Sequence, residues 1–513
     1  MSSIIIKNGH VFDPLNGIKG DVMDIFIENG KIVEKISDES KAKIIDAKGK
    51  TVMPGGVDSH SHIAGPKVNT GRLMRPEDSR RFEFKKTKIL QSGTGETVPT
   101  CALTGYEYSL MGYTTVMEAA MPPLEALHTH EELNNIPMID KAAYTIFGNN
   151  WFVMRYLKEK QIEKAAAYVS WTLRRVKGYG IKIVNPAGVT EWGWGRNVNS
   201  LDQVIPNFDI TPREIIKGLA EVNEILNLPM SIHLHANNLG KPGNCEITEQ
   251  SLRIVENIRI NPPNSKFKRK QNIYLAHAQF NSFAGNSWSD FASGSKKITD
   301  YINSHDNVVI DIGAIIFGNA TIMTGDGPAI HYIYKLAGGK WCNKDIECEG
   351  GAGIIPFVYK ESSPVHSIQW SIGLELALFT NDLSKVILTT DHPNGGPFTK
   401  YPEVIAYLMS SKYRKETLNS IHKFAMERSR IGETERELSL YDIATITRAT
   451  PAISIGLADR KGNLGINADA DVAIYDIDPE NFDSSNYNLI IDKFSRALYT
   501  IKDGEILVEN GEI

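Results

Sequence analysis

The sequence predicts an α/β protein: a (β/α)8 TIM-like barrel with a small β-sandwich domain formed by both termini. Eight apolar, strand-like runs alternate with helical stretches in the central part of the chain. The two terminal segments instead contain short strands separated by turns. A chain of 513 residues can bury a barrel core and still supply a smaller domain. A doubly wound open sheet is the alternative for the central part.

The two ends of the chain have matching strand-and-turn patterns. Asn-Gly turn signals at residues 8–9 and 29–30 separate apolar runs near the N-terminus. A few strands alone cannot form a stable core, so this segment needs a partner. Residues 471–476 and 498–508 have the same pattern near the C-terminus. We therefore predict a composite β domain from residues 1–52 and 459–513, and a barrel from residues 53–458.

The barrel is predicted from the positions of its strands and from one well-marked helix. The eight candidate strands are residues 57–62, 114–118, 141–147, 181–184, 230–235, 273–278, 307–312 and 386–391. Thr211 and Glu214 form a capping box, and Pro212 occupies the first helical position, so a helix begins there. Strands alternating with helices favour a parallel sheet, which closes as a barrel when there are eight strands.

The composition is that of an ordinary globular protein. Lys+Arg 56 against Asp+Glu 61 leave a formal charge of −5, and 42% of the residues are hydrophobic. We therefore expect neither a nucleic-acid partner nor a membrane partner. The first residues lack the apolar core of a signal peptide, and no apolar run approaches the ~20 residues that span a bilayer. Four cysteines do not make a disulfide framework in so long a chain, so we expect a cytoplasmic protein.

Histidines at the end of the first barrel strand are the starting point for the site. In a barrel the catalytic side chains lie at the C-terminal ends of the strands. His60 and His62 are two residues apart on a strand, so they face the same side and can hold one metal ion. The pair alone is a weak motif, because polar residues commonly end a strand. His128 and His130 are also two residues apart, but in a helical or loop region, where they make a poor chelator.

Other strands deliver further ligand types to the same rim. These residues are Lys182 in the fourth strand, His233 and His235 in the fifth, His277 at the end of the sixth and Asp391 at the end of the eighth. Each has an ordinary alternative: a core histidine, a lysine reaching solvent, or a helix-capping aspartate. Together they fit zinc, which accepts imidazole and carboxylate ligands. A neutral, desolvated lysine can add carbon dioxide to form a carbamate that bridges two metals ~3.5–4 Å apart.

These residues resemble the amidohydrolase superfamily over nearly the whole chain. The motifs that carry the resemblance are PGGVDSHSH, the strand lysine, LHAN, LAHA and TTDHP. More closely, GVDSHSHIAGPKVNTGRLMRPEDSRR, KIVNPAG with EWGWG, and TTDHPNGGPF look like the amidohydrolase-type subunit of formylmethanofuran dehydrogenases. Those enzymes belong to archaeal methanogens and their relatives.

The resemblance implies a barrel of the metal-dependent hydrolase type with two zinc ions. The implied ligands are His60, His62, N6-carboxylated Lys182, one histidine of the fifth strand, His277 and Asp391. The sequence alone does not choose between His233 and His235, although the His-Ala-Asn motif points to His235. Asp391 would also be the catalytic residue that transfers protons.

The resemblance also implies a reaction and a set of partners. Partner subunits that carry a molybdenum or tungsten pterin and iron–sulfur clusters reduce carbon dioxide to formate. The amidohydrolase-type subunit then condenses formate with the amine of methanofuran to give formylmethanofuran, in methanogenesis from carbon dioxide. This condensation is amide hydrolysis run backwards at the same site.

Basic residues crowd the segment that follows the first barrel strand. They are Arg72, Arg75, Arg80, Arg81, Lys85, Lys86 and Lys88. Methanofuran, as the substrate of the family, has a carboxylate-rich tail, and arginine suits bidentate carboxylate contacts. We therefore expect Arg72 and Arg75 to bind substrate. The alternative is a face that contacts solvent or a neighbouring protein of the complex.

Two other functions fit parts of the pattern. A stand-alone cyclic amidase, similar to dihydropyrimidinase or hydantoinase, would use the same ligands, but EWGWG and DHPNGGPF speak against it. A non-catalytic scaffold that retained the barrel would bind no stoichiometric zinc. It would also tolerate the substitution Lys182→Ala.

Overall fold

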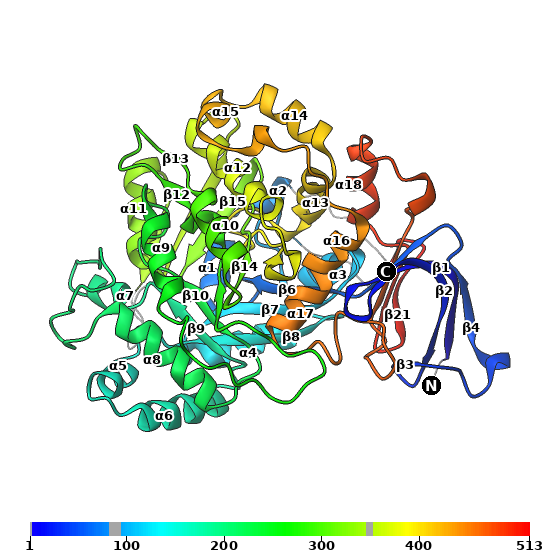
Figure 1. Ribbon diagram of the computed structural model, residues 1–513, viewed down its shortest axis with the longest axis horizontal. Helices are drawn as coiled ribbons and strands as arrows, with labels where there is room; N and C mark the ends of the chain where they lie inside the picture. Colours follow the sequence, from blue (N-terminus) through cyan, green and yellow to red (C-terminus); the bar gives the residue numbers. More distant parts are fainter. Residues whose placement is uncertain (1–2, 82–93, 345–351) are drawn as a thin grey trace.

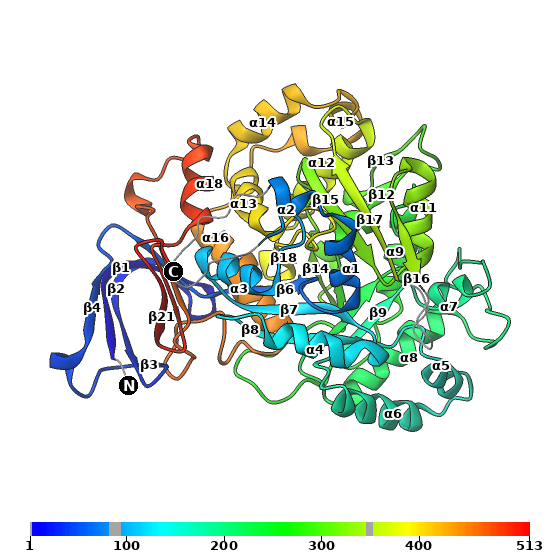
Figure 2. The same cartoon turned by 180° about the vertical axis from the view of Figure 1, so that it is seen from behind.

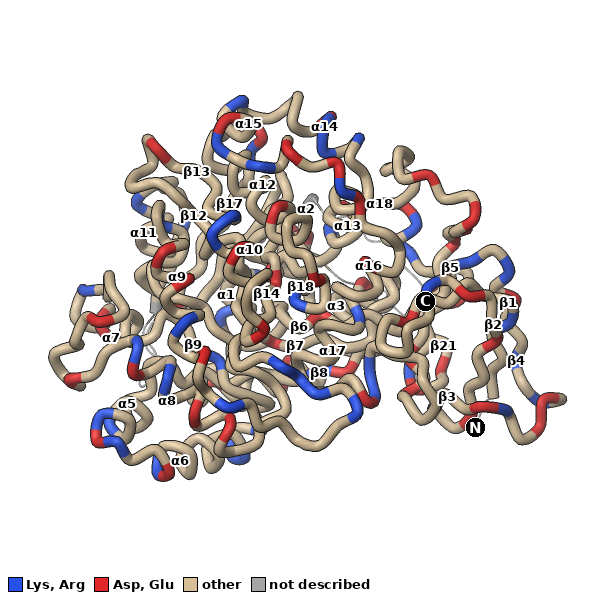
Figure 3. The backbone as a smooth tube through the Cα atoms, viewed as in Figure 1, with Lys and Arg blue, Asp and Glu red and all other residues tan. Residues whose placement is uncertain are grey.

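The computed structural model describes residues 3–81, 94–344 and 352–513. A large α/β part occupies one side of the molecule, and a smaller sheet that contains both termini lies beside it (Figure 1). Among the described residues, no helix combines the length and the apolar character needed to cross a membrane. Figure 3 shows basic and acidic positions interspersed along the backbone, as expected from the nearly balanced composition.

The central sheet has eight strands whose spatial order follows their order in the sequence. They are β6 (Gly56–Ser61), β7 (Tyr113–Met121), β8 (Asp140–Ile146), β9 (Ile181–Val184), β10 (Ile232–His235), β11 (Ile273–Leu275), β14 (Val308–Asp311) and β18 (Val386–Ile387). All neighbouring pairs are parallel. Each of the eight predicted strands has a counterpart here. The middle strands are wholly buried and rich in Val, Ile and Leu, as expected for parallel strands covered on both faces.

A short contact joins the first strand to the segment that follows the last one. Ser61 forms an isolated parallel bridge with His392, and the His62 N–H donates to the His392 carbonyl at 2.8 Å. The order of the strands is that of a (β/α)8 barrel and differs from the reversed order of a doubly wound sheet. The predicted fold class is confirmed.

The helices lie around this sheet (Figures 1 and 2). They are α1 (Pro66–Met74), α2 (Asp78–Arg81), α3 (Cys101–Leu110), α4 (Ala126–Asn134), α5 (Trp151–Lys158), α6 (Ile162–Arg175), α7 (Gly188–Trp192), α8 (Pro212–Ile225), α9 (Asn244–Arg253), α10 (Ser295–Ser304), α11 (Gly327–Ala337), α12 (Pro364–Leu378), α13 (Tyr401–Met409), α14 (Ser411–Ser420), α15 (Phe424–Arg428), α16 (Leu440–Ala444), α17 (Thr450–Ser454) and α18 (Tyr487–Ser495). Helix α8 has the predicted capping box between Thr211 and Glu214, with Pro212 in its first turn.

The second sheet is built from both ends of the chain. Its strands run in the order β21 (Glu505–Glu509), β20 (Tyr499–Lys502), β19 (Val472–Tyr475), β5 (Thr51–Pro54), β1 (Ile4–Asp13), β2 (Ile18–Glu28) and β3 (Lys31–Val33), while β4 (Lys43–Asp46) pairs with β1. Strand β5 joins the two ends, because it pairs with β1 on one side and with β19 on the other. The domain boundaries at residues 52 and 459 stay a prediction, and β5 lies across the first of them.

The C-terminal segment also contains a helix, which its strand-like pattern did not predict. Helix α18 begins after Asn486, whose side chain accepts a hydrogen bond from the Leu489 N–H. Ile490 and Phe494 are its buried residues, and the helix packs against α13 of the barrel. Burial against a helix of the other part decides this conformation, so a local pattern gives little indication of it.

A smaller unit is inserted between the seventh and eighth barrel strands. It contains an antiparallel sheet with the strand order β15 (Gly318–Thr324), β17 (Ala352–Tyr359) and β16 (Cys342–Lys344). In the chain, α11 lies between β15 and β16. A two-stranded ribbon, β12 (Phe283–Ala284) with β13 (Ala292–Ser293), follows the sixth barrel strand. Residues of β15, α11 and β17 line the same cavity as the barrel strand ends, so this unit forms a wall above the site.

Candidate metal centre

A cavity of about 700 Å³ opens at the C-terminal ends of the barrel strands. The predicted ligands His60, His62, Lys182, His235, His277 and Asp391 all lie in its lining. Each of these side chains is buried. The upper wall is mainly apolar and includes Phe280, Trp288, Ile322, Ile333 and Phe357. The cavity therefore combines a polar floor with a wall that favours an apolar ligand.

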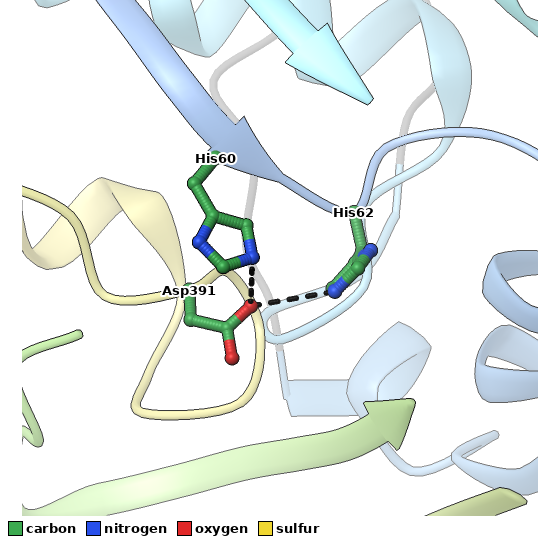
Figure 4. Close-up of side chains that lie close together, drawn as sticks. All are labelled: His60, His62 and Asp391. Atoms are coloured by element: carbon green, nitrogen blue, oxygen red, sulfur yellow. Dashed lines mark ion pairs between the residues drawn. The ribbon is translucent and has the colours of Figure 1, made fainter. Parts of the chain in front are cut away.

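Three of the predicted ligands converge on one point (Figure 4). The Nε2 atoms of His60 and His62 lie 3.0 Å and 3.3 Å from the same oxygen, Oδ1 of Asp391. One ligand atom from each of the three residues lies within 4.8 Å of the others. Strand β6 places both imidazoles on one face because side chains two residues apart on a strand point the same way.

Buried carboxylates contact the Nδ1 atom of each imidazole, on the side of the ring away from Asp391. His60 Nδ1 lies 2.8 Å from Asp311 Oδ2, and His62 Nδ1 lies 3.2 Å from Glu118 Oε1. A carboxylate accepts the Nδ1 proton, so Nε2 is the nitrogen that faces Asp391. Burial lowers the pKa of the His60 ring, but Asp311 and Asp391 outweigh burial and raise it to about 9, so a metal ion at this point would take the place of the Nε2 proton. Ligating histidines in metal sites are commonly oriented in this way.

The pair His60 Nε2 and Asp391 Oδ1 shows that the site fits a metal ion. Both atoms are buried and, although they lie 3.0 Å apart, they are not aligned as a hydrogen bond and have no other hydrogen-bond partner. Buried polar atoms without partners are costly, and a cation that both can coordinate removes this cost. Imidazole and carboxylate are also the ligands that zinc accepts.

Lys182 lies beside these residues on β9. Burial is the main cause that lowers the pKa of its amine to about 7, against the opposing effect of Asp391 and Asp311. Its Nζ is 2.8 Å from Nδ1 of His233, which is its partner in the register of β9 and β10. A substantial fraction of this amine is therefore neutral near pH 7, and only a neutral amine can add carbon dioxide.

The geometry favours His235 over His233 as the ligand from the fifth strand. His235 lines the cavity, and its Nδ1 lies 3.0 Å from Nε2 of His277. His233 is not part of the lining and packs against the rings of Tyr144 and Tyr274. His233 does lie near His60 and Asp311, and those three could also hold a cation. Burial lowers the pKa of both His235 and His277, which keeps the imidazoles neutral and able to coordinate metal.

Two predicted ligands have unusual backbone conformations. His277 and Asp391 have φ values of 35° and 50°, in the left-handed region that residues with side chains seldom adopt. Such strain clusters at functional sites. The backbone of His277 also needs Gly313 beside it, because a Cβ at Gly313 would lie 2.7 Å from the His277 Cα.

The sequence comparisons place the chain in a family. A family model described as the amidohydrolase family matches residues 43–508. The chain belongs to the amidohydrolase family. It is 54% identical over 510 residues to Protein FwdA of Methanocaldococcus jannaschii, a match that covers 99% of this chain and 88% of that protein. It is 35% identical over 523 residues to a subunit of the formyltransferase/hydrolase complex Fhc of Methylorubrum extorquens, with coverage of 99% and 88%.

Solved amidohydrolase-like structures agree with these relatives. The crystal structure of the formyltransferase/hydrolase complex FhcABCD from Methylorubrum extorquens, in complex with methylofuran, contains a chain that matches with a TM-score of 0.89 and 34% identity. The match covers 100% of this chain and 89% of that chain. Dihydropyrimidinase from Brevibacillus agri shares only the fold, with a TM-score of 0.52 at 15% identity, covering 100% and 96% of the two chains. The resemblance predicted from the motifs is thus confirmed.

Three carboxylates of this amidohydrolase site were missing from the sequence-based prediction. Asp311 ends the seventh barrel strand, Glu118 lies within the second, and Asp326 precedes α11. They contact His60, His62 and His235, respectively. A lone acidic residue in an otherwise apolar strand was the available signal for Asp311 and Glu118. Asp326 lies outside the barrel strands, and its sequence gave no comparable signal.

The predicted substrate-binding arginines have protein partners instead. Arg72 donates to Glu132 Oε1 at 2.8 Å and to the Pro99 carbonyl. Arg75 is only 4% exposed, and it donates to Asp78 Oδ1 and to the Ala320 carbonyl at 2.8 Å and 2.6 Å. Neither arginine lines the cavity.

Binding of a substrate carboxylate by Arg72 and Arg75 stays a prediction, to which the internal partners of both residues add no support. Arg72 is partly buried and Arg75 is buried, and both guanidinium groups donate to internal acceptors. Of the other basic residues in that segment, Lys85, Lys86 and Lys88 lie outside the described residues, as do the side chains of Arg80 and Arg81.

Proposed function

We propose that this amidohydrolase forms and hydrolyses the N-formyl amide of methanofuran, as the amide-forming subunit of a formylmethanofuran dehydrogenase. The observation that carries the proposal is the convergence of the six ligand-type side chains on the floor of one cavity. The 54% identity to Protein FwdA over nearly the whole chain supports this choice among amidohydrolase reactions. The likeness to a complex solved with methylofuran supports a furan-amine substrate.

The ligand set divides naturally between two zinc ions. His60, His62 and Asp391 would hold one ion, and His235 and His277 the other. Carboxylated Lys182 would supply an oxygen to each. When bound, the zinc ions would polarise the formyl oxygen and stabilise the negative charge that develops there.

Asp391 is the group that moves protons. Burial alone would raise the pKa of its carboxyl, but the positive charge of the His60 ring, the largest opposing cause, holds that pKa well below its usual range. The carboxylate is therefore ionised at neutral pH and can accept a proton from the attacking nucleophile. In hydrolysis Asp391 returns this proton to the leaving amine, and in condensation the same steps run in reverse.

The walls of the cavity can position the substrate beside the ligand-type side chains. Phe280, Trp288 and Phe357 provide an apolar surface against which a furan ring can pack.

The proposed reaction needs partner subunits that deliver formate. Formate would come from a subunit that carries a molybdenum or tungsten pterin and is supplied with electrons through iron–sulfur clusters. The multi-subunit composition of the FhcABCD structure supports an assembly in which this chain contacts other subunits.

The test uses the purified full chain, loaded with zinc and bicarbonate. We expect about two zinc ions per chain, as two-metal hydrolases bind, and release of formate from formylmethanofuran. The Lys182→Ala variant should lose both. Hydrolysis of hydantoin without hydrolysis of formylmethanofuran would support the cyclic amidase instead. A chain with no stoichiometric zinc would indicate the scaffold.

A further inference from the structure

Asp326 contacts a predicted metal ligand from outside the barrel. Its Oδ2 lies 3.1 Å from Nε2 of His235, and Asp326 is only 1% exposed. On the basis of the proposed two-metal site, we infer that Asp326 is a positioning residue that selects Nδ1 of His235 as the metal-binding atom.

The inference follows from which nitrogen each carboxylate contacts. A carboxylate can only accept, so the His235 Nε2 must carry the proton that Asp326 receives. In the neutral ring this leaves the lone pair on Nδ1. That Nδ1 lies 3.0 Å from the Nε2 of His277, the other predicted ligand of the same ion. His60 and His62 have the opposite arrangement, because their carboxylates contact Nδ1 and leave Nε2 free.

The carboxylate of Asp326 is held in one orientation by its other oxygen. Oδ1 accepts from the Ala329 N–H at 3.1 Å and from the Asn185 side-chain amide at 3.0 Å. The first contact caps the N-terminus of α11. The second ties Asp326 to the residue that follows β9, the strand of Lys182. These two donors hold Oδ1, and Oδ2 therefore points to the His235 ring.

The EWGWG motif supports the helix start at which Asp326 lies. Trp192 of this motif packs next to Gly327, the first residue of α11, where a Cβ would lie 2.9 Å from two atoms of the indole ring. The same ring packs against His331, one turn further along α11, at 5.2 Å between centroids. Trp192 therefore packs against the first turns of α11, the helix whose N-terminus Asp326 caps.

The substitution Asp326→Asn tests the inference with little change in shape. The asparagine oxygen can keep the cap on Ala329, because asparagine is as good an N-cap as aspartate. Its Nδ2 would then face His235 and donate to Nε2, which moves the ring proton to Nδ1 and removes the metal-binding lone pair. We expect zinc affinity at this ion to fall about 10–100-fold, the usual effect of losing such an orienting partner.

The measurement is zinc content and zinc affinity of the full chain, loaded with zinc and bicarbonate, in competition with a chelator. The parent chain should keep both ions at a chelator concentration at which Asp326→Asn keeps only the ion held by His60 and His62. The variant Asp326→Ser, whose hydroxyl can still cap α11 but does not reach His235, should show the same partial loss. Asp382→Asn is the matched control, because Asp382 caps a short helix away from the cavity.

The outcomes separate this inference from the proposed function. Zinc affinities of Asp326→Asn and Asp326→Ser equal to the parent would overturn the role of Asp326 while the two-metal site stands. A parent chain that binds no zinc would overturn the proposed function itself. Equal zinc loss in the Asp382→Asn control would also contradict the inference, because it would make the effect one of general stability.

Discussion

Glu118 is predicted to support both the folded state and the metal centre, and a pair of substitutions separates these roles. Its Oε1 lies 3.3 Å from the Lys67 ammonium and 3.2 Å from His62 Nδ1. Its Oε2 accepts from the backbone N–H groups of Ile63 and Ala64. Lys67 is itself 5% exposed. The substitution Glu118→Gln therefore leaves a buried ammonium without its counter-ion.

Two independent estimates of the free energy of unfolding lost in Glu118→Gln agree. Removing one partner of a buried ion pair costs about 3–5 kcal/mol. Burial alone would raise the pKa of Glu118, but Lys67 and His62 lower it from 4.5 to about 2. That shift corresponds to about 3 kcal/mol of stability. Because the folded-state pKa is lowered, this stability is present above about pH 4.5 and is lost as the pH falls towards 2.

The assay is denaturant unfolding of the chelator-treated full chain, followed by zinc titration. Glu118→Gln should lower the free energy of unfolding by about 3 kcal/mol. Adding Lys67→Met should restore part of that stability but leave zinc affinity low, because His62 still lacks its carboxylate acceptor. Glu159→Gln, which breaks an exposed pair with Arg155, should change stability by less than about 1 kcal/mol. Full zinc affinity in the double variant would refute this reasoning.

Three further outcomes are expected. Gly313→Ala should lower zinc affinity, because its Cβ would meet the His277 backbone at 2.7 Å; unchanged affinity in chelator competition would contradict this. Bicarbonate-dependent zinc loading should rise from about pH 6 to about pH 8 as Lys182 becomes neutral near its pKa of about 7, and a flat profile would argue against a carbamate. Asp391→Asn should lower formylmethanofuran hydrolysis at least about 10²-fold, and near-parental turnover would remove Asp391 from its proton-transfer role.

The metal ligands predicted from the sequence share one property: they lie in a barrel strand or shortly after one. Alternation on a strand and the rule that barrel sites lie at C-terminal strand ends were enough to select His60, His62, Lys182 and His277. The choice between His233 and His235 needed the structure, because both face the same side of β10 and only the depth of the cavity distinguishes them.

The arginines show why a cluster of basic residues in the sequence gives little indication of the partners of each side chain. Arg75 donates to the carbonyls of Ala320 and Phe357, which follow it by 245 and 282 residues in the chain. Contacts of such long range cannot be read from a local cluster of basic residues. The contact of Asp326 with His235 could not be predicted from the sequence for the same reason, because the two residues are 91 positions apart.

We propose that two zinc ions share a carboxylated Lys182 on the floor of the cavity. Anomalous scattering at the zinc edge, from crystals of the full chain grown with zinc and bicarbonate, tests it most directly. We expect two zinc positions, one beside His60, His62 and Asp391 and the other beside His235 and His277, joined by carbamate density on Lys182. A free Lys182 amine with a single zinc ion, or zinc bound by His233 in place of His235, would contradict it.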